Sequence, residues 1–329
     1  MYLKSGETMR RLAALFMLLP VTAVAQVTVQ EYPVPRGHGV HDVWADAAPG
    51  GPVWISAQGS GHLGILDPKS GKLDFVALAE ERGSGSSPHG VVAGPDGAPW
   101  LTDGGQNAMV RVDAKTRAVK VFKLPEDSGY TNLNTAIFDR AGIVWFTGQS
   151  GIYGRLDPKS GEMKTFDAPK GRGPYGIHAT PDGTVYYASL AGSHIARINP
   201  ASGEATVIQP PTPRQGARRV WSDSKGNLWV SEWSSGNLSR YEPATGKWST
   251  WRAPGASPHV YAVYVDETDK VWASEWTAQV MLRFDPQTGK FESYRSSSQV
   301  ANVRQIHGRR GEVWTPESAA DKVVVYRFK

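Results

Sequence analysis

A short strand-like segment with a central aromatic residue recurs seven times along this chain, at intervals of 41 to 46 residues. The seven aromatic residues are Trp54, Trp100, Trp145, Tyr186, Trp229, Trp272 and Trp314. A second motif follows the first six copies, as in LDPKSGK (66–72) and FDPQTGK (284–290). Five of its six copies combine Asp, Asn or Glu before Pro with Ser/Thr-Gly, which predicts a tight turn because Pro presets φ and Gly accepts positive φ. The chain is therefore an array of similar units rather than a set of unrelated segments.

Each unit holds four strand-like segments. Runs that flank the turn motif, such as HLGILD (62–67), alternate apolar and polar residues, as half-buried strands do. The abundance of Trp, Tyr and Gly in the whole chain also favours short strands and turns over long helices. Four antiparallel strands per repeat of this length are typical of one propeller blade. We predict an all-β, seven-bladed β-propeller with four-stranded antiparallel blades.

The two ends of the repeat array predict how the ring closes. The seventh unit has strand-like segments at 303–308, 312–317 and 322–328, and no fourth segment follows them. The segment VTVQEYPVP (27–35) precedes the first unit and is similar to the fourth strands of the other units. We expect this N-terminal segment to pair with the last blade, because an unpaired sheet edge would otherwise remain.

The N-terminus has the pattern of a secretory leader. Arg10 and Arg11 precede an apolar run from Leu12 to Leu19, and Ala-Val-Ala ends at Ala25. This predicts a signal peptide over 1–25 with cleavage near Ala25, a single propeller domain over 26–329, and a periplasmic or secreted location. Since the chain has no cysteine, its stability must come from packing rather than from disulfides.

Charge and hydropathy exclude some partners. The formal net charge is +5 with no long basic run, which argues against binding of nucleic acid. The apolar run in the leader is too short to span a bilayer, so we expect no membrane span. We expect a monomer.

The residues that differ between units lie where the first strands begin, at the predicted mouth of the central channel. The candidates for binding a small-molecule or peptide-like ligand there are His41, His89, Tyr175, Arg218, Arg219, Tyr261 and Arg304. Divergence at equivalent positions of a symmetric scaffold is what one asymmetric ligand requires. We expect these side chains to be exposed, so that His89→Ala or Tyr261→Phe leaves stability nearly unchanged.

Three acidic residues follow the aromatic strands of the last units: Glu232, Glu275 and Glu317. Such carboxylates could hold Mg²⁺ together with water molecules. They could equally pair with the arginines of the mouth. The sequence leaves both interpretations open.

Repeated units that combine PHG, a W(F/L/V)(T/S) strand and a DPx(S/T)G turn resemble the virginiamycin B lyase (streptogramin B lyase) family of seven-bladed propellers. The resemblance implies a Mg²⁺-assisted elimination that linearises a cyclic depsipeptide. It also implies a substrate-binding His on the sixth blade, where His259 matches. A Glu-Pro-His-Gly motif on the seventh blade would supply a metal ligand and the general base, and a later Glu would complete the metal site.

The seventh blade departs from that family motif. Asn302 occupies the motif position of the metal-binding Glu, and Arg304 occupies that of the catalytic His. Glu317 matches the second metal ligand. Arg304 stays protonated and cannot act as a base, so His259 or His307 are the candidate catalytic residues. We expect inefficient linearisation of streptogramin B antibiotics. Two hypotheses follow: a lyase-like activity on a cyclic ester or lactone, with Mg²⁺ at Glu317 and Asn302, or a non-catalytic ligand-binding or scaffolding propeller.

Overall fold

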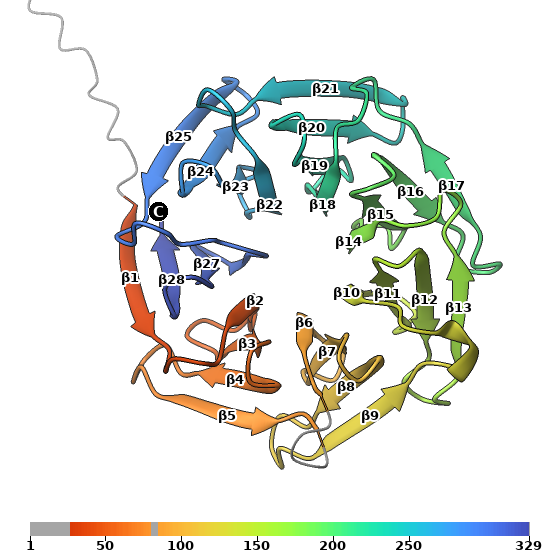
Figure 1. Cartoon of the computed structure of the whole chain (residues 1–329). Helices are drawn as coiled ribbons and strands as arrows, with labels where there is room; N and C mark the ends of the chain where they lie inside the picture. Colours follow the sequence, from red (N-terminus) through yellow and green to blue (C-terminus); the bar gives the residue numbers. More distant parts are fainter. Residues whose placement is uncertain (1–26, 80–84, 329) are drawn as a thin grey trace, which may run out of the picture.

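The computed structural model describes residues 27–79 and 85–328, which form seven four-stranded antiparallel sheets around a central channel (Figure 1). The predicted seven-bladed propeller is confirmed. The predicted leader, 1–25, lies outside the described residues. Within the described ranges, no helix is long and apolar enough to cross a membrane.

The strands of each blade run in order from the channel outward. The innermost strands are β2 (Val40–Ala45), β6 (Pro88–Ala93), β10 (Leu133–Phe138), β14 (Pro174–Ala179), β18 (Ala217–Ser222), β22 (Val260–Val265) and β26 (His307–Arg309). The second strands are β3 (Val53–Ala57), β7 (Pro99–Asp103), β11 (Val144–Gly148), β15 (Val185–Ser189), β19 (Leu228–Glu232), β23 (Val271–Glu275) and β27 (Glu312–Glu317).

The outer half of each blade carries the turn motif. The third strands are β4 (His62–Leu66), β8 (Ala108–Val112), β12 (Ile152–Leu156), β16 (His194–Ile198), β20 (Asn237–Glu242), β24 (Val280–Asp285) and β28 (Lys322–Arg327). The outermost strands are β5 (Leu73–Ala77), β9 (Val119–Lys123), β13 (Met163–Asp167), β17 (Ala205–Ile208), β21 (Lys247–Arg252), β25 (Lys290–Arg295) and β1 (Thr28–Pro33). One short 3₁₀ turn, η1 (Glu126–Ser128), follows β9.

The N-terminal strand closes the ring, as predicted. β1 pairs with β28 along its full length, from Thr28 opposite Arg327 to Pro33 opposite Lys322. Tyr32 on β1 is buried, and its ring stacks on Trp314 with a centroid distance of 5.5 Å. The last blade is therefore built from both ends of the described chain.

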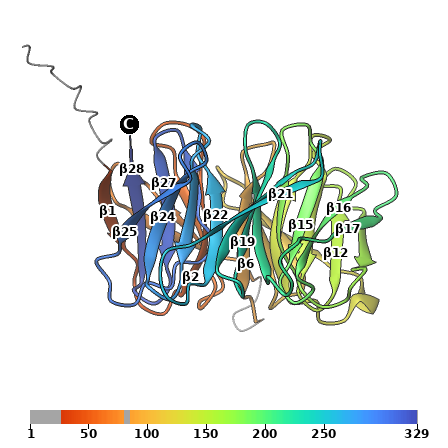
Figure 2. The ribbon, with the colours of Figure 1, turned by 90° about the horizontal axis from the view of Figure 1, so that it is seen from above.

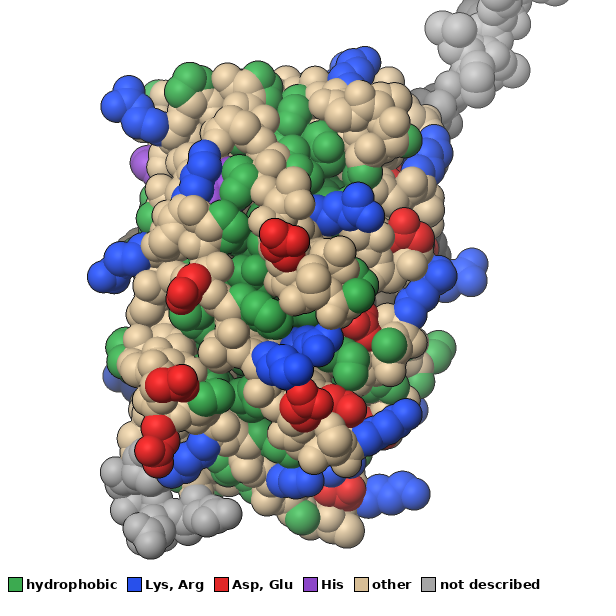
Figure 3. Space-filling view, turned by 90° about the vertical axis from the view of Figure 1, so that its right-hand side faces the viewer, with side chains coloured by type: hydrophobic (Ala, Val, Ile, Leu, Met, Phe, Trp, Pro, Cys, Tyr) green, Lys and Arg blue, Asp and Glu red, His purple; other side chains and the backbone are tan. Residues whose placement is uncertain are grey.

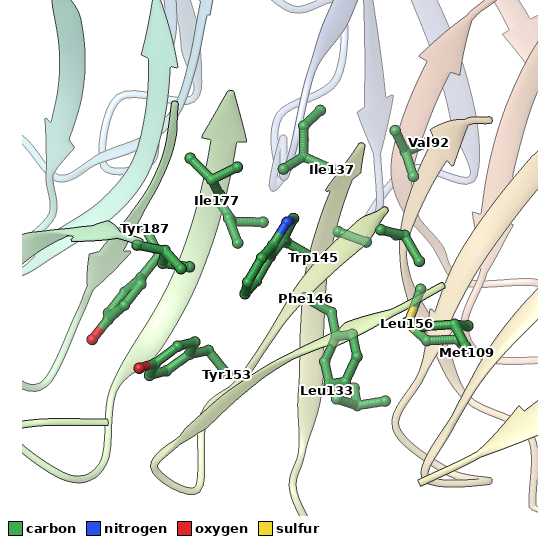
Figure 4. Packing of buried hydrophobic residues seen from close by; sticks show 14 of the residues in the cluster. Val92, Met109, Leu133, Ile137, Trp145, Phe146, Tyr153, Leu156, Ile177 and Tyr187 are labelled. Atoms are coloured by element: carbon green, nitrogen blue, oxygen red, sulfur yellow. The ribbon is translucent and has the colours of Figure 1, made fainter. Parts of the chain in front are cut away.

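The repeated aromatic residues form the packing between blades. All seven are buried. Trp145 of β11 and Ile177 of β14, in the next blade, belong to one apolar cluster with Phe146, Tyr153 and Tyr187 (Figure 4). On the side of the outer wall that Figure 3 shows, basic and acidic side chains are interspersed, with apolar side chains between them. In the edge-on view, inner strands such as β22 run roughly parallel to the ring axis (Figure 2).

A β-bulge near the start of six of the inner strands affects the direction of the mouth residues. In six blades the register shifts after the first residue of the strand, as between Val40 and Val43 or between Val260 and Val263. A bulge adds one unpaired residue and redirects its neighbours. In the fifth blade the bulge places the neighbouring residues Arg218 and Arg219 near the mouth.

A hydroxyl on the second strand holds the bulge and the next blade together. Thr102 Oγ1 accepts a hydrogen bond from the Gly90 amide at 2.8 Å and donates one to the Asn134 carbonyl of the next blade at 2.6 Å. Four other blades repeat this arrangement, through Ser56, Thr147, Ser231 and Ser274. These side chains explain the Ser or Thr in the repeated strand motif.

The seventh inner strand is shorter than predicted. Instead of 303–308, the ladder covers only His307–Arg309, with an isolated bridge between Val303 and Glu317. Pro316 lies opposite this gap and has no N–H to donate. Gln305 forms a bridge to Asp42 of the first blade instead.

Candidate functional site

The second residue of each inner strand contributes to a ring at one end of the channel. Its members are His41, His89, Asn134, Tyr175, Arg218, Tyr261 and, at the equivalent place beside the Val303 bridge, Arg304. All of the predicted ligand-binding residues belong to this ring except Arg219, which follows Arg218 within the bulge. The structure therefore brings the predicted mouth residues together from different blades.

A buried ion pair lies across the channel beside this ring. Arg219 of the fifth blade approaches Asp42 of the first blade, with 3.3 Å between the guanidinium nitrogen and a carboxylate oxygen. His41 Nδ1 lies 2.7 Å from the other oxygen of Asp42. Burial acts to raise the pKa of Asp42, but Arg219 and His41 outweigh it and lower that pKa below its usual value. Asp42 is therefore ionised, and His41 is oriented by it.

The channel below the ion pair is nearly filled by side chains. The cavity lined by Asp42, Thr135, Arg219 and Gln305 measures about 20 Å³. That volume accommodates about one water molecule. A ligand larger than water must therefore bind at the mouth and not within the channel.

Arg218 lies over an aromatic surface at the mouth. Its guanidinium carbon is 3.6 Å from the centre of the Tyr261 ring and 4.3 Å from that of Trp233. The same guanidinium donates a hydrogen bond to the Tyr175 hydroxyl at 3.0 Å, and the hydroxyls of Tyr175 and Tyr261 are 2.7 Å apart. Cation–π contacts of this kind hold an arginine in place without neutralising its charge.

The two phenols differ in acidity. Burial acts to raise the pKa of Tyr261, but Arg218 and the other mouth arginines lower it below its ordinary value. Burial, together with the charge of Tyr261, raises the pKa of Tyr175 to about 12. Tyr261 is therefore the more acidic member of the pair.

Arg304 lies beside the histidines. One of its terminal nitrogens is 3.5 Å from His41 Nε2, and its Nε donates to Ser318 Oγ at 3.2 Å. The rings of His41 and His89 are nearly perpendicular, with centroids 4.8 Å apart. Burial lowers the pKa of His89 to about 3 and also lowers the pKa of His41. Both imidazoles are therefore neutral at neutral pH.

The expected exposure of the mouth residues is wrong for several of them. His41, Tyr175 and Tyr261 are buried, and Tyr261 has no exposed surface. The aromatic residues Trp233 and Trp276, which the sequence analysis did not single out, pack against Tyr261 with centroid distances of 5.9 and 5.2 Å. Both follow the Glu of a repeated Ser-Glu-Trp sequence, which is the signal that would have identified them.

The structure places the two candidate catalytic histidines differently. His259 lies at the rim of the mouth, where its ring centre is 4.9 Å from that of Trp233 and its Nδ1 is 2.9 Å from Thr277 Oγ1. His307 is not at the mouth. It stacks on Trp44 at 3.7 Å, and its Nδ1 accepts a hydrogen bond from the Ala45 amide.

His307 belongs to a second ring, three residues further along the inner strands. The aromatic members of this ring are Trp44, His178, Trp221, Tyr264 and His307. Burial lowers the pKa of both His178 and His307 to about 3. His307 is therefore a neutral packing residue in this structure.

Glu317 and Asn302 do not fit a magnesium site. The carboxylate of Glu317 is buried and accepts hydrogen bonds from Ser296 at 2.6 Å and Ser298 at 2.8 Å. Asn302 Oδ1 accepts from Gln279 Nε2 at 3.2 Å. No group of three or more His, Asp or Glu side chains in the described ranges is arranged to hold a metal ion. Mg²⁺ requires several oxygen ligands in near-octahedral geometry, and these oxygens are already used.

The equivalent carboxylates of other blades have the same role as Glu317. Glu275 accepts hydrogen bonds from the backbone amides of His259 and Thr277, and Glu232 accepts them from Ser235 and Asn237. Each carboxylate thus holds the loop that follows its strand. In the described structure these glutamates form no salt bridge with the mouth arginines, and their role as metal ligands stays a prediction.

Comparison with known proteins gives consistent results. A virginiamycin B lyase family model matches residues 21–281. The fold is similar to that of virginiamycin B lyase from Staphylococcus aureus, with a TM-score of 0.81 and 20% sequence identity over 92% of this chain and 99% of that chain. A streptogramin B lyase structure is similar at a TM-score of 0.82 and 19% identity, over 92% and 98% of the two chains.

A curated relative provides a second, partial likeness. A gluconolactonase from Zymomonas mobilis is 28% identical over 145 residues, which is 39% of this chain and 39% of the relative. This match spans well under half of either protein. The family match, by contrast, covers most of the propeller. The chain belongs to the virginiamycin B lyase family.

Proposed function

We propose that the channel mouth binds an anionic small-molecule or peptide-like ligand through Arg218 and Arg304. The observation that supports this proposal is the charge of the mouth. Among the described residues, Arg218 and Arg304 contact hydroxyl groups, an imidazole and aromatic rings, but form no salt bridge with a carboxylate. Asp42 is already shared by Arg219 and His41. Positive charge without a counter-charge attracts anions.

The surroundings of the arginines indicate which anion fits. A guanidinium presents a planar set of N–H donors that matches a carboxylate, and stacking on aromatic rings keeps that plane fixed. Trp233 and Trp276 supply apolar surface beside Arg218 and Arg304. The ligand is therefore a carboxylate attached to a planar or apolar body.

Binding can be tested by calorimetry with a charged and a neutral probe of the same shape. N-acetylphenylalanine should bind, whereas N-acetylphenylalanine amide should not. Arg218→Gln and Arg304→Gln should each weaken binding about tenfold or more, because hydrogen bonds to charged groups contribute about 1.5–3 kcal/mol. Arg197→Gln is the control, since Arg197 is an exposed arginine of β16 away from the mouth. Equal binding of the two probes would contradict the proposal.

A second candidate function is the opening of a lactone, which the pairing of His41 with Asp42 favours. Asp42 orients His41 through Nδ1, so the second nitrogen, Nε2, faces Arg304. A carboxylate-oriented neutral imidazole is the usual form of a general base. The partial likeness to a gluconolactonase supports this class of substrate. The product would be a hydroxy acid, and its carboxylate could bind to the mouth arginines.

The reaction balances with water as the only co-reactant. His41 Nε2 takes a proton from water, and the water oxygen bonds to the carbonyl carbon. Arg304 faces the negative charge that develops on the carbonyl oxygen. The ring C–O bond then breaks, and the ring oxygen leaves with the proton from His41 as the hydroxyl of the product.

A pH-stat assay with glucono-δ-lactone tests this candidate. His41→Gln should lower the enzymatic rate at least a hundredfold, the usual contribution of a general base. His62→Gln, on β4 of the same blade, is the matched control and should keep the rate. If the wild-type rate does not exceed that of spontaneous hydrolysis, lactone opening is excluded and ligand binding alone remains.

A further inference from the structure

Three blades share one arrangement around the tryptophan of the second strand. In the third blade, Trp145 Nε1 donates to Asp139 at 2.8 Å, and Arg155 lies 5.9 Å from the ring centre. The fifth and sixth blades repeat both contacts, with Trp229, Asp223 and Arg240 and with Trp272, Asp266 and Arg283. In these blades the indole N–H has an acceptor, and a guanidinium covers the ring.

The second blade lacks both contacts. Gly94 occupies the position of Asp139, and Trp100 Nε1 is buried without a hydrogen-bond partner in the described structure. Arg111, the counterpart of Arg155, pairs instead with Asp96 at 2.7 Å. A buried unpaired donor costs free energy, so the surroundings of Trp100 differ from those of the tryptophans that have an acceptor.

A cavity of about 530 Å³ lies at this place, between the second and third blades. It is lined by the loops that follow β6 and β10 and by the turn after β12, which lie at the ends of the strands opposite to the mouth. Its aromatic wall is formed by Trp100 with Phe122 and Phe138, whose ring centres lie 5.4 and 5.6 Å from that of Trp100. The volume is that of a pocket for a small organic molecule.

The charge of the cavity is positive. Lys120, Arg140 and Lys159 line it. Its one carboxylate, Asp96, is neutralised by Arg111. Lys120 Nζ lies 4.5 Å from the centre of the Phe122 ring, which places a cation directly beside the aromatic wall.

We propose that this cavity is a second binding site, separate from the mouth, for a small aromatic carboxylate. The aromatic body packs against Phe122 and Phe138, and the carboxylate faces Lys120 and Arg140. Trp100 lines the same wall, so its indole N–H resonance reports on occupancy of the cavity. The site does not depend on the function of the mouth.

Phenylacetate is the probe, and the indole N–H resonances of the ¹⁵N-labelled protein are the readout. The resonance of Trp100, identified by its loss in Trp100→Phe, should shift on titration, whereas that of Trp145 should stay in place. Neutral phenylacetamide should leave both resonances unchanged. Arg304→Gln should not alter the response, because Arg304 belongs to the mouth.

Two charge variants complete the test. Lys120→Gln should weaken phenylacetate binding at least several-fold, and the double variant with Arg140→Gln should weaken it more than tenfold. Lys164→Gln is the matched control, since Lys164 occupies the position of Lys120 in the third blade. The proposal is overturned if the Trp100 resonance does not respond to millimolar phenylacetate. An equal response to the amide, or an equal effect of Lys164→Gln, would overturn it too.

Discussion

Tyr261 combines complete burial with a polar hydroxyl and three neighbouring cations. Its hydroxyl is paired with that of Tyr175, and its ring carries the guanidinium of Arg218. Such a residue supports the shape of the mouth, and a ligand reaches it only through Arg218 and the tryptophans beside it. The mouth thus has two layers, an accessible layer of cations and a buried layer that positions them.

Tyr261→Phe should therefore lower the free energy of unfolding by about 1 kcal/mol, the usual contribution of one buried hydrogen bond. Trp229→Ala should cost more, about 3–5 kcal/mol, because it leaves a cavity between blades. Urea unfolding measures both values. Tyr130→Phe, at an exposed tyrosine, is the control. A Tyr261→Phe variant as stable as the control would mean that the Tyr175 contact contributes nothing.

His178 should make stability depend on pH. Burial lowers its pKa to about 3, whereas an unfolded chain has the ordinary value near 6.5. Below pH 6.5 the unfolded state binds more protons than the folded state, so stability falls as the pH falls from 6.5 towards 3. At pH 5 the protonation of His178 in the unfolded state should lower the free energy of unfolding by about 2 kcal/mol. In His178→Phe the difference in unfolding free energy between pH 7 and pH 5 should shrink by that amount, and an unchanged difference would refute the assignment.

At the scale of the strand, β1 is the element whose removal is most informative. It supplies the outer edge of the last blade, and Tyr32 on it packs against Trp314. Deleting residues 26–35 should leave β28 with an open edge, lower the melting temperature and promote aggregation. Calorimetry with light scattering measures both effects. A deletion variant that melts like the chain beginning at Gln26 would contradict this account of ring closure.

The blades were predictable from the sequence because each strand has its own local signal. Turn residues mark the ends, and the buried aromatic marks the second strand. The bulges had no such signal, so the order of Arg218 and Arg219 at the mouth could not be decided. The same limit affected His307. A side chain three residues further along an inner strand belongs to the second ring and not to the mouth, and the sequence did not show which of the two rings His307 joins.

For the whole molecule, family membership suggests a lyase activity that the side chains of the site do not support. The fold is similar to that of streptogramin lyases, but the sequence motif predicts Arg304 at the position of the base, and the oxygens of Glu317 accept hydrogen bonds from serines. The protein should therefore not linearise a streptogramin B efficiently in the presence of Mg²⁺. Mass spectrometry follows ring opening directly. Rapid linearisation that EDTA abolishes would show that this structure misses a competent metal site.

The hydroxyl contacts between neighbouring blades have a mechanical consequence. They join blades one to four in one series and blades five to seven in another. Ala188 in the fourth blade and Pro316 in the seventh have no hydroxyl for this contact. The junction from seventh to first is still held by Arg309, which donates to backbone carbonyls of the first blade, as at Gly51. The fourth and fifth blades are joined by other contacts, in which the Gly216 amide donates to Ser193 Oγ at 3.1 Å and Arg218 donates to the Tyr175 hydroxyl at 3.0 Å. Each junction of the ring is therefore bridged by at least one hydrogen bond, and resistance to opening is spread around the whole circle.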